Sequence, residues 1–254
     1  MTAHRDLHLE LLHRLWRFGR AELGALAAMI IAGTGLWAFA ELADDMMEDE
    51  GHGLDALVLA YMRPNANPHD ALGPRWFEHA VAELTTFGGT ANLTVIALVV
   101  VLFLLIQKRL ASVLLVVFAL GGGVVISESV KLLFGRDRPP LIYRAVETTN
   151  ASFPSGHAML STITYLTLGA LLAQVMPKKR LKSFVFAVAI LLALIVGASR
   201  VYLGVHWLTD VLAGWALGAA WAMICWLVAW WIRRSLRRHP GVISEPPVSG
   251  EDRP

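Results

Sequence analysis

The chain has 254 residues, of which 56% are hydrophobic, and its mean hydropathy is +0.56. Because soluble domains contain about 45–50% apolar residues, this composition indicates a membrane protein. The formal net charge of +2 is too small to indicate nucleic-acid binding, and the single cysteine, Cys225, excludes an internal disulfide and argues against a cysteine-based metal site.

The first 40 residues divide into a charged part and an uncharged part. Residues 1–20 contain arginines among leucines, which predicts a cytoplasmic amphipathic helix at the membrane surface, with a disordered tail as the alternative. Residues 23–40 carry no charge over about the length that crosses a hydrocarbon core. Acidic residues follow this stretch, and no convincing cleavage site follows it. We therefore expect an uncleaved first span rather than a removed signal peptide.

Residues 43–89 are the least hydrophobic internal region and are rich in aspartate, glutamate and proline. They predict an extracytoplasmic loop between the first and second spans, with a short helix near residues 54–62.

Five further uncharged stretches follow, and with the first they predict six transmembrane helices: residues 84–107, 110–127, 158–177, 183–199 and 211–232. The expected fold is an all-α integral membrane protein in which residues 21–236 form one six-span membrane domain. Residues 237–254 are polar and rich in proline, and they predict a disordered cytoplasmic tail.

Lysine and arginine are concentrated in the segments expected on the cytoplasmic side, which are residues 5–20, 108–109, 178–182 and 233–238. With this orientation, polar residues collect at the extracytoplasmic ends of the spans: Lys131 ends the third, His157 begins the fourth, Arg200 ends the fifth, and His206 and Asp210 begin the sixth. The centres of the spans are nearly free of ionisable residues, whereas a transporter more often places such residues near the midplane.

Three blocks hold these polar residues at fixed spacings: Lys131, six residues and Arg138-Pro139; Pro154-Ser155-Gly156-His157; and Ser199-Arg200, five residues, His206, three residues and Asp210. A phosphoryl group in transfer spreads negative charge over three oxygens, so its catalyst needs fixed cations and backbone N–H donors. Lys131, Arg138 and Arg200 can supply the cations. Ser155 and Gly156 precede an apolar stretch, where the free N–H groups of a helix start can bind an anion and glycine allows close approach.

His206 and Asp210 are four residues apart and so share one face of a helix. The carboxylate can take the proton of one ring nitrogen and leave the other as a nucleophile. His157 is the remaining candidate for a general acid. A purely structural histidine–aspartate pair is the alternative, but three neighbouring cations favour the catalytic interpretation.

Other residues near the blocks have simpler interpretations. Arg136 is expected to make a local ion pair or a headgroup contact, and Glu128, three residues before Lys131, is expected to position that lysine. Gly214 and Gly218 form a small-xxx-small pair, for which packing inside the bundle is favoured over dimerisation.

Together the three blocks resemble the signature of the type-2 phosphatidic acid phosphatase superfamily, which includes membrane lipid phosphatases and the vanadium haloperoxidases. The resemblance implies that His206 is a nucleophile forming a phosphohistidine, that Asp210 orients it, and that His157 protonates the leaving group. It also implies that neither a metal nor another cofactor is needed, and that five residues bind the phosphate: Lys131, Arg138, Ser155, Gly156 and Arg200.

The resemblance predicts hydrolysis of a lipid phosphate or diphosphate at the outer face of the bacterial cytoplasmic (inner) membrane, with the bilayer and its lipid as partners and no nucleic acid. Undecaprenyl diphosphate ranks first as substrate, because recycling of that carrier yields an outward-facing lipid diphosphate. Phosphatidylglycerophosphate, phosphatidate and a lipid A phosphate are alternatives, since the motifs recognise phosphate rather than the lipid tail.

Three other functions compete with this expectation. A vanadate-dependent haloperoxidase would use the same phosphate site, but the membrane spans argue against it. A non-catalytic lipid-phosphate transporter or scramblase would bind the substrate without cleaving it, and phosphate release distinguishes the two. A purely structural membrane protein would have no use for these residues.

Overall fold

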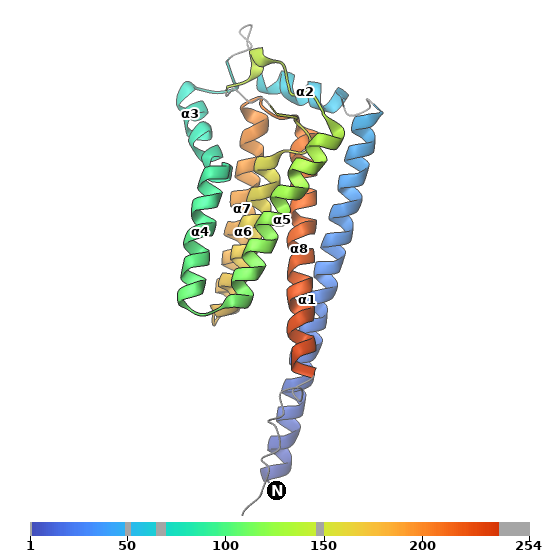
Figure 1. The fold of residues 1–254 in the computed structure, drawn as a ribbon, viewed down its shortest axis with the longest axis vertical. Coiled ribbons are helices and arrows are strands. Elements are labelled where there is room, and N and C mark those ends of the chain that lie inside the picture. Colours follow the sequence, from blue (N-terminus) through green and yellow to red (C-terminus); the bar gives the residue numbers. More distant parts are fainter. Residues whose placement is uncertain (1, 49–51, 65–69, 146–149, 239–254) are drawn as a thin grey trace, which may run out of the picture.

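The computed structural model describes residues 2–48, 52–64, 70–145 and 150–238, and every regular element in these ranges is helical (Figure 1). In chain order the elements are α1 (Thr2–Met47), α2 (His52–Met62), α3 (Arg75–Leu84), the 3₁₀ helix η1 (Thr85–Gly88), α4 (Thr90–Ile106), α5 (Leu110–Phe134), the 3₁₀ helix η2 (Leu141–Tyr143), α6 (Gly156–Val175), α7 (Lys179–Tyr202) and α8 (Leu208–Arg238). The predicted all-α class is confirmed.

Five helices of the described chain are long and apolar enough to cross a membrane: α1 from Glu22, α5, α6, α7, and α8 as far as Leu236. A sixth span arises when α3 and η1 are counted together with α4, to which they are joined with a bend of 46°. The chain is therefore a multi-pass membrane protein, as predicted.

The predicted span over residues 84–107 did not include the bend that the structure shows before α4. Contacts with other helices explain this bend. A Cβ on Gly88 would come within 2.1 Å of Val196 Cγ1 on α7, so glycine permits this close approach. The Tyr165 hydroxyl of α6 donates to the carbonyl of Phe87 at 2.6 Å. Gly89 is then extended and forms the N-cap of α4, so the straight part of this span begins only at Thr90.

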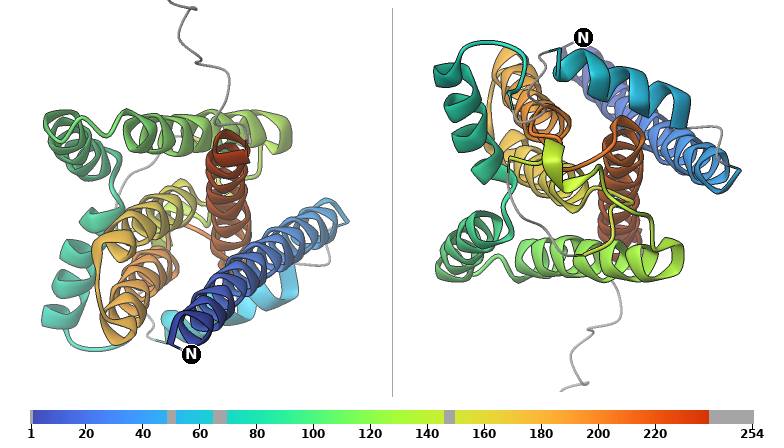
Figure 2. Two further views of the ribbon diagram at one scale, coloured as in Figure 1. Left: turned by 90° about the horizontal axis from the view of Figure 1, so that it is seen from below. Right: turned by 90° about the horizontal axis from the view of Figure 1, so that it is seen from above.

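Helix α6 lies between α5, α7 and α8 and is the most enclosed span (Figure 2). Its close packing against α8 depends on small residues. A Cβ added at Gly214 would lie 2.8 Å from the carbonyl oxygen of Ser155, and one at Gly218 would lie 2.7 Å from that of Met159. The prediction that the glycine pair packs inside the bundle is confirmed.

Helices α1 and α8 run side by side (Figures 1 and 2), with a close approach at Gly35 and an ion pair between Glu22 and Arg234. The α1 backbone is one unbroken helix from Thr2 to Met47. The predicted amphipathic segment 1–20 therefore continues into the first span, and its side chains lie outside the described residues. Of the predicted disordered tail, residues 237–254, the part from residue 239 onward also lies outside the described residues.

One end of the bundle, at the top of Figure 1, is covered by α2, α3, η2 and the segment that joins α5 to α6. We call it the loop end. The predicted short helix near residues 54–62 is present as α2. Because α5 and α7 finish at the loop end and α6 and α8 begin there, the three sequence blocks meet in this place.

Candidate active site

Lys131 lies in the last turn of α5. The helix stops at Gly135, which adopts a left-handed conformation (φ 58°) and donates its N–H to the Lys131 carbonyl at 3.0 Å. The Lys131 side chain is buried, and its ammonium donates to Glu128 Oε1 at 2.7 Å. The predicted positioning of Lys131 by Glu128 is therefore present.

The start of α6 lies against this lysine. Ser155 is the N-cap, and its hydroxyl accepts a hydrogen bond from the N–H of Ala158 at 3.5 Å. Lys131 Nζ lies 3.2 Å from the point where a Cβ on Gly156 would stand. The ammonium and the free N–H groups of this first turn together form a site suited to an anion.

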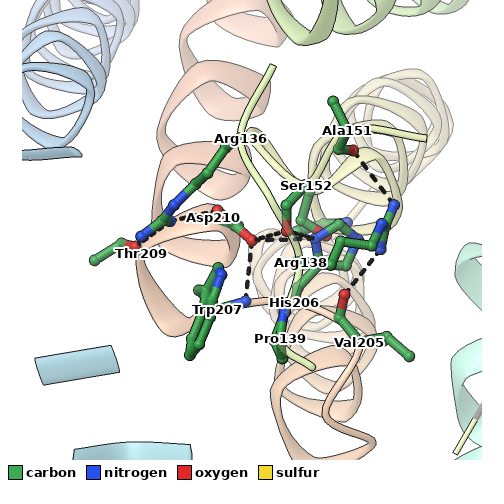
Figure 3. Close-up of polar contacts among 12 residues, drawn as sticks. Arg136, Arg138, Pro139, Ala151, Ser152, Val205, His206, Trp207, Thr209 and Asp210 are labelled. Carbon is green, nitrogen blue, oxygen red and sulfur yellow. Dashed lines mark hydrogen bonds and ion pairs between the residues drawn. The ribbon is translucent and has the colours of Figure 1, made fainter. Parts of the chain in front are cut away.

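His206 lies in the turn between α7 and α8, and Asp210 lies in the first turn of α8 (Figure 3). Both side chains are buried, and His206 Nδ1 is 3.3 Å from Asp210 Oδ2. A neutral imidazole that donates its Nδ1–H to the carboxylate keeps a lone pair on Nε2. The expected pairing is present, but the expectation that both residues share one face of a helix needs correction, because His206 precedes α8.

Arg138 lies beside that second nitrogen, with Nη1 3.1 Å from His206 Nε2. The same Nη1 donates to the carbonyl of Val205 at 2.8 Å. The rest of the guanidinium donates to Asn150, from Nε to the carbonyl at 2.8 Å and from Nη2 to Oδ1 at 2.7 Å. Since these acceptors are neutral, the positive charge of Arg138 remains available to an anion next to His206.

Arg200 and His157 complete the group. Arg200 is buried at the end of α7, where Nη1 donates to Thr85 Oγ1 at 3.1 Å and Nε finds no hydrogen-bond partner among the described residues. His157 is half-buried in the first turn of α6 and lies within the electrostatic reach of four other site residues: Lys131, Arg138, Arg200 and His206. The structure thus brings all eight predicted site residues to the loop end.

Asp210 has more partners than its sequence spacing to His206 indicates. Arg136 Nη1 donates to Oδ1 at 2.6 Å, the backbone N–H of Trp207 donates to Oδ2 at 3.0 Å, and the Ser152 hydroxyl also donates to Oδ2 (Figure 3). The buried carboxylate is therefore fully satisfied. The expectation of a local ion pair for Arg136 needs correction, because this partner lies 74 positions away in the sequence.

Sequence reasoning did not single out Ser152 or Asp55, and both belong to this network. Asp55 lies on α2 and forms an ion pair with Arg136 at 2.8 Å. The signal that could have found Asp55 is a lone carboxylate in an otherwise uncharged apolar helix. Ser152 carries no comparable signal, since a serine in a polar connection is ordinary.

Burial lowers the pKa of His206 to about 4, and its contact with Asp210 offsets this only in part. The nearby guanidinium groups of Arg138 and Arg200 act in the same direction as burial. At neutral pH the imidazole is therefore uncharged and carries a lone pair. Burial also lowers the pKa of Arg138, against the opposing effect of Asp210.

The arrangement joins a neutral, buried histidine to fixed cations and a helix N-terminus. Such a site can bind a phosphoryl group and present a nitrogen nucleophile to it. Within the described residues, no three histidine, cysteine, aspartate or glutamate side chains are grouped so that they could hold a metal ion.

The fold has a counterpart among solved structures. It matches the crystal structure of a transmembrane PAP2-type phosphatidylglycerolphosphate phosphatase from Bacillus subtilis with a TM-score of 0.67. The match covers 84% of this chain and 98% of that chain, at 22% sequence identity. At this identity the likeness shows a shared fold.

Sequence comparisons lead to the family. The PAP2 superfamily model matches residues 112–234, which include every predicted site residue. The chain is 30% identical over 147 residues to phosphatidylglycerophosphatase B of Bacillus subtilis, covering 56% of this chain and 70% of that protein. It is 35% identical over 122 residues to undecaprenyl-diphosphatase of Sulfolobus acidocaldarius, covering 46% of this chain and 55% of that protein. The family predicted from the three blocks is confirmed: the chain belongs to the PAP2 superfamily.

Proposed function

We propose that this protein is a metal-independent membrane lipid phosphatase that hydrolyses a lipid phosphate or diphosphate through a phosphohistidine. The observation that carries this proposal is the state of His206, which is buried and neutral, is oriented by Asp210, and has its second nitrogen beside Arg138. The predicted hydrolase class is also supported by the two curated relatives, which are both named as phosphatases.

In the first step, the lone pair of His206 Nε2 attacks phosphorus while the bond from phosphorus to the lipid oxygen breaks. His157 donates a proton to that leaving oxygen. Asp210 accepts a hydrogen bond from the Nδ1–H of His206 and stabilises the positive charge that develops on the imidazole ring. The anionic phosphoryl oxygens are held by the predicted phosphate-binding residues: Lys131, Arg138, Ser155, Gly156 and Arg200.

In the second step, a water molecule attacks the phosphorus of the phosphohistidine. His157, now neutral, takes a proton from this water as the P–N bond breaks, and inorganic phosphate is released. His206 returns to its neutral form, so the cycle needs no other reactant.

Undecaprenyl diphosphate is the proposed substrate, and phosphatidylglycerophosphate is the closest alternative, in keeping with the names of the two relatives. An apolar groove of about 320 Å³ supports a lipid as substrate. It lies between α4, α5 and α6, and Leu160 on its wall is one helical turn below His157. A lipid tail in this groove would leave its headgroup at the loop end.

We place the loop end on the extracytoplasmic side of the bacterial inner membrane, because the positively charged connections lie at the opposite ends of the spans. A reporter fused after Arg238 should then be found in the cytoplasm. A reporter found outside the cytoplasm would contradict this orientation.

The deciding experiment measures phosphate release in detergent with excess EDTA. Wild type, His206→Ala and His79→Ala are compared on undecaprenyl diphosphate, phosphatidylglycerophosphate, phosphatidate and a lipid A phosphate. His79 is an exposed histidine of α3 and serves as the matched control. We expect release by wild type and His79→Ala and none by His206→Ala. Equal release by His206→Ala would exclude the mechanism, and lipid binding without any release would favour a transporter.

A further inference from the structure

Two charged residues of α2 and its end are buried, although the helix itself is short and apolar. Asp55 is 2% exposed, and Arg63, which follows the helix directly, is 7% exposed. Burying a charge costs free energy unless the charge is paired or hydrogen-bonded. The partners of these two residues therefore indicate what α2 is for.

Asp55 binds the first turn of α8. Its Oδ1 accepts the backbone N–H of Thr209 at 3.0 Å, and its Oδ2 accepts the Thr209 hydroxyl at 2.6 Å. The N–H of Thr209 is one of the first-turn donors that a helix leaves unpaired. The carboxylate of Asp55, which belongs to another helix, thus caps α8 at Thr209. Thr209 directly precedes the buried Asp210.

Asp55 also reaches Asp210 through a shared cation. The guanidinium of Arg136 donates from Nη2 to Asp55 at 2.8 Å and from Nη1 to Asp210 at 2.6 Å. Figure 3 shows Arg136 extended toward both Thr209 and Asp210. Because Arg136 lies between two carboxylates, removal of either charge changes the position and the field of the cation beside the other.

Arg63 holds the turn on the other side of His206. Its Nη1 donates to the carbonyl of Tyr202 and its Nη2 to that of Tyr143, each at 2.9 Å. This turn contains Gly204, with φ +66°, where an added Cβ would lie 2.2 Å from the Tyr143 carbonyl oxygen. The chain is therefore fixed at Tyr202, before the histidine, and at Thr209, after it.

We propose that α2 is a positioning clamp for the nucleophile, in which Arg63 and Asp55 hold the α7–α8 turn on either side of His206. This inference rests on the proposed phosphatase function and adds residues of the loop between the first two spans to that site. Asp55 and Arg63 act as positioning residues, through the backbone of the turn and through Arg136. The loop is then part of the catalytic apparatus rather than only a cover over it.

Asp55→Asn tests the clamp, with Asp44→Asn as the matched control, because Asp44 is an exposed aspartate near the end of α1. In detergent, we expect kcat of Asp55→Asn to fall about 10- to 100-fold, the size that a small misplacement of reacting groups produces. KM should stay within about twofold, because the residues predicted to bind phosphate are unchanged. A merely structural role would lower the yield of folded protein without this division between kcat and KM.

A second measurement reports on the turn without depending on activity. Diethylpyrocarbonate modifies accessible neutral histidines, and peptide mass spectrometry gives the rate at His206 relative to the exposed His79. If Asp55→Asn releases the turn, the relative rate of modification at His206 should rise severalfold in that variant. In Asp44→Asn the relative rate should stay unchanged. If Asp55→Asn does not fold, Thr209→Val, which removes only the hydroxyl contacts, is judged by the same two criteria.

An unchanged labelling rate at His206, or a kcat within twofold of wild type, overturns the clamp. If wild type releases no phosphate from any lipid, the proposed function fails by itself. The labelling rates then still decide whether α2 holds the turn.

Discussion

The guanidinium of Arg138 lies against the ring nitrogen that the proposed mechanism uses as nucleophile, with Nη1 3.1 Å from His206 Nε2. A cation is therefore in contact with the atom that attacks in the proposed mechanism. In the proposed mechanism a bound phosphoryl group would enter between these two side chains, and its oxygens would accept hydrogen bonds from Arg138 as the nitrogen approaches phosphorus. Under that mechanism Arg138 would stabilise the transferring group as well as bind it.

Replacement of Arg138 by lysine should separate charge from geometry. Lysine keeps the positive charge but cannot reach His206, Val205 and Asn150 at once, because it lacks the planar fork. We expect kcat to fall about 10²–10³-fold, as when one preorganised donor to a transition state is lost. Steady-state phosphate release measures this effect, with Arg75→Lys on the exposed start of α3 as control. Activity close to wild type in Arg138→Lys would show that charge alone is sufficient.

The acid limb of the pH profile tests the environment of His206. Its pKa is lowered to about 4, chiefly by burial, so the imidazole stays neutral as pH falls below the value near 6.5 that is usual for histidine. The rate of diethylpyrocarbonate modification at His206 should therefore decline with a midpoint near pH 4. A histidine-containing peptide provides the reference with a midpoint near 6.5. Coincidence of the two midpoints would contradict the buried neutral state.

The lowered pKa of His206 also makes the stability of the folded protein depend on pH. Below pH 6.5 the unfolded chain takes up a proton at His206 that the folded chain does not. This group therefore favours unfolding increasingly as pH falls from about 6.5 to about 4. The thermal midpoint of His206→Gln should fall less than that of wild type over this interval.

Gly156→Ala tests the contact between Lys131 and the start of α6. An added Cβ would stand 3.2 Å from Lys131 Nζ and 3.6 Å from Ser127 Oγ, so the flexible end of the lysine has to move away. We expect kcat/KM to fall about 10- to 100-fold, the effect of losing one hydrogen bond to a charged group, with little change in Tm. Gly33→Ala on α1 is the control, because nothing lies within 4 Å of its added Cβ. Equal kinetics in both variants would remove Gly156 from the site.

The parts of the site that could be predicted from sequence are those set by short spacings. His206 and Asp210 are one helical turn apart, Glu128 and Lys131 are three residues apart, and Ser155 directly precedes its helix. The last two relationships follow from the geometry of one helix, whereas His206 lies in the turn before α8 and reaches Asp210 across the start of that helix. Membrane spans were predictable for a similar reason, since a hydrocarbon core requires continuous apolar stretches.

The relationships that the sequence did not reveal join distant segments. Asp55 and Thr209 are separated by 154 positions, and Arg63 binds backbone carbonyls, which are present at every residue. The break before α4 likewise depends on the close approach of Gly88 to Val196 and not on a local change in hydropathy. These features arise only when the helices are packed against one another.

Asp210→Asn tests how much of the rate depends on orientation of the nucleophile, because the variant keeps His206 itself. The amide is close in shape to the carboxylate, but its NH2 group stands either at the Oδ1 position, to which Arg136 donates, or at the Oδ2 position, to which Ser152 and Trp207 donate. With the NH2 group at the Oδ2 position, His206 loses the acceptor for its Nδ1–H, and in either position it loses the negative charge that would stabilise the charge developing on its ring. We expect kcat to fall by up to about 10⁴-fold, the effect reported for the equivalent change in a serine protease triad. Single-turnover assays should still show release above His206→Ala, because Nε2 remains in place beside Arg138. Complete loss in a folded Asp210→Asn sample would instead mean that the carboxylate is as essential as the nucleophile itself.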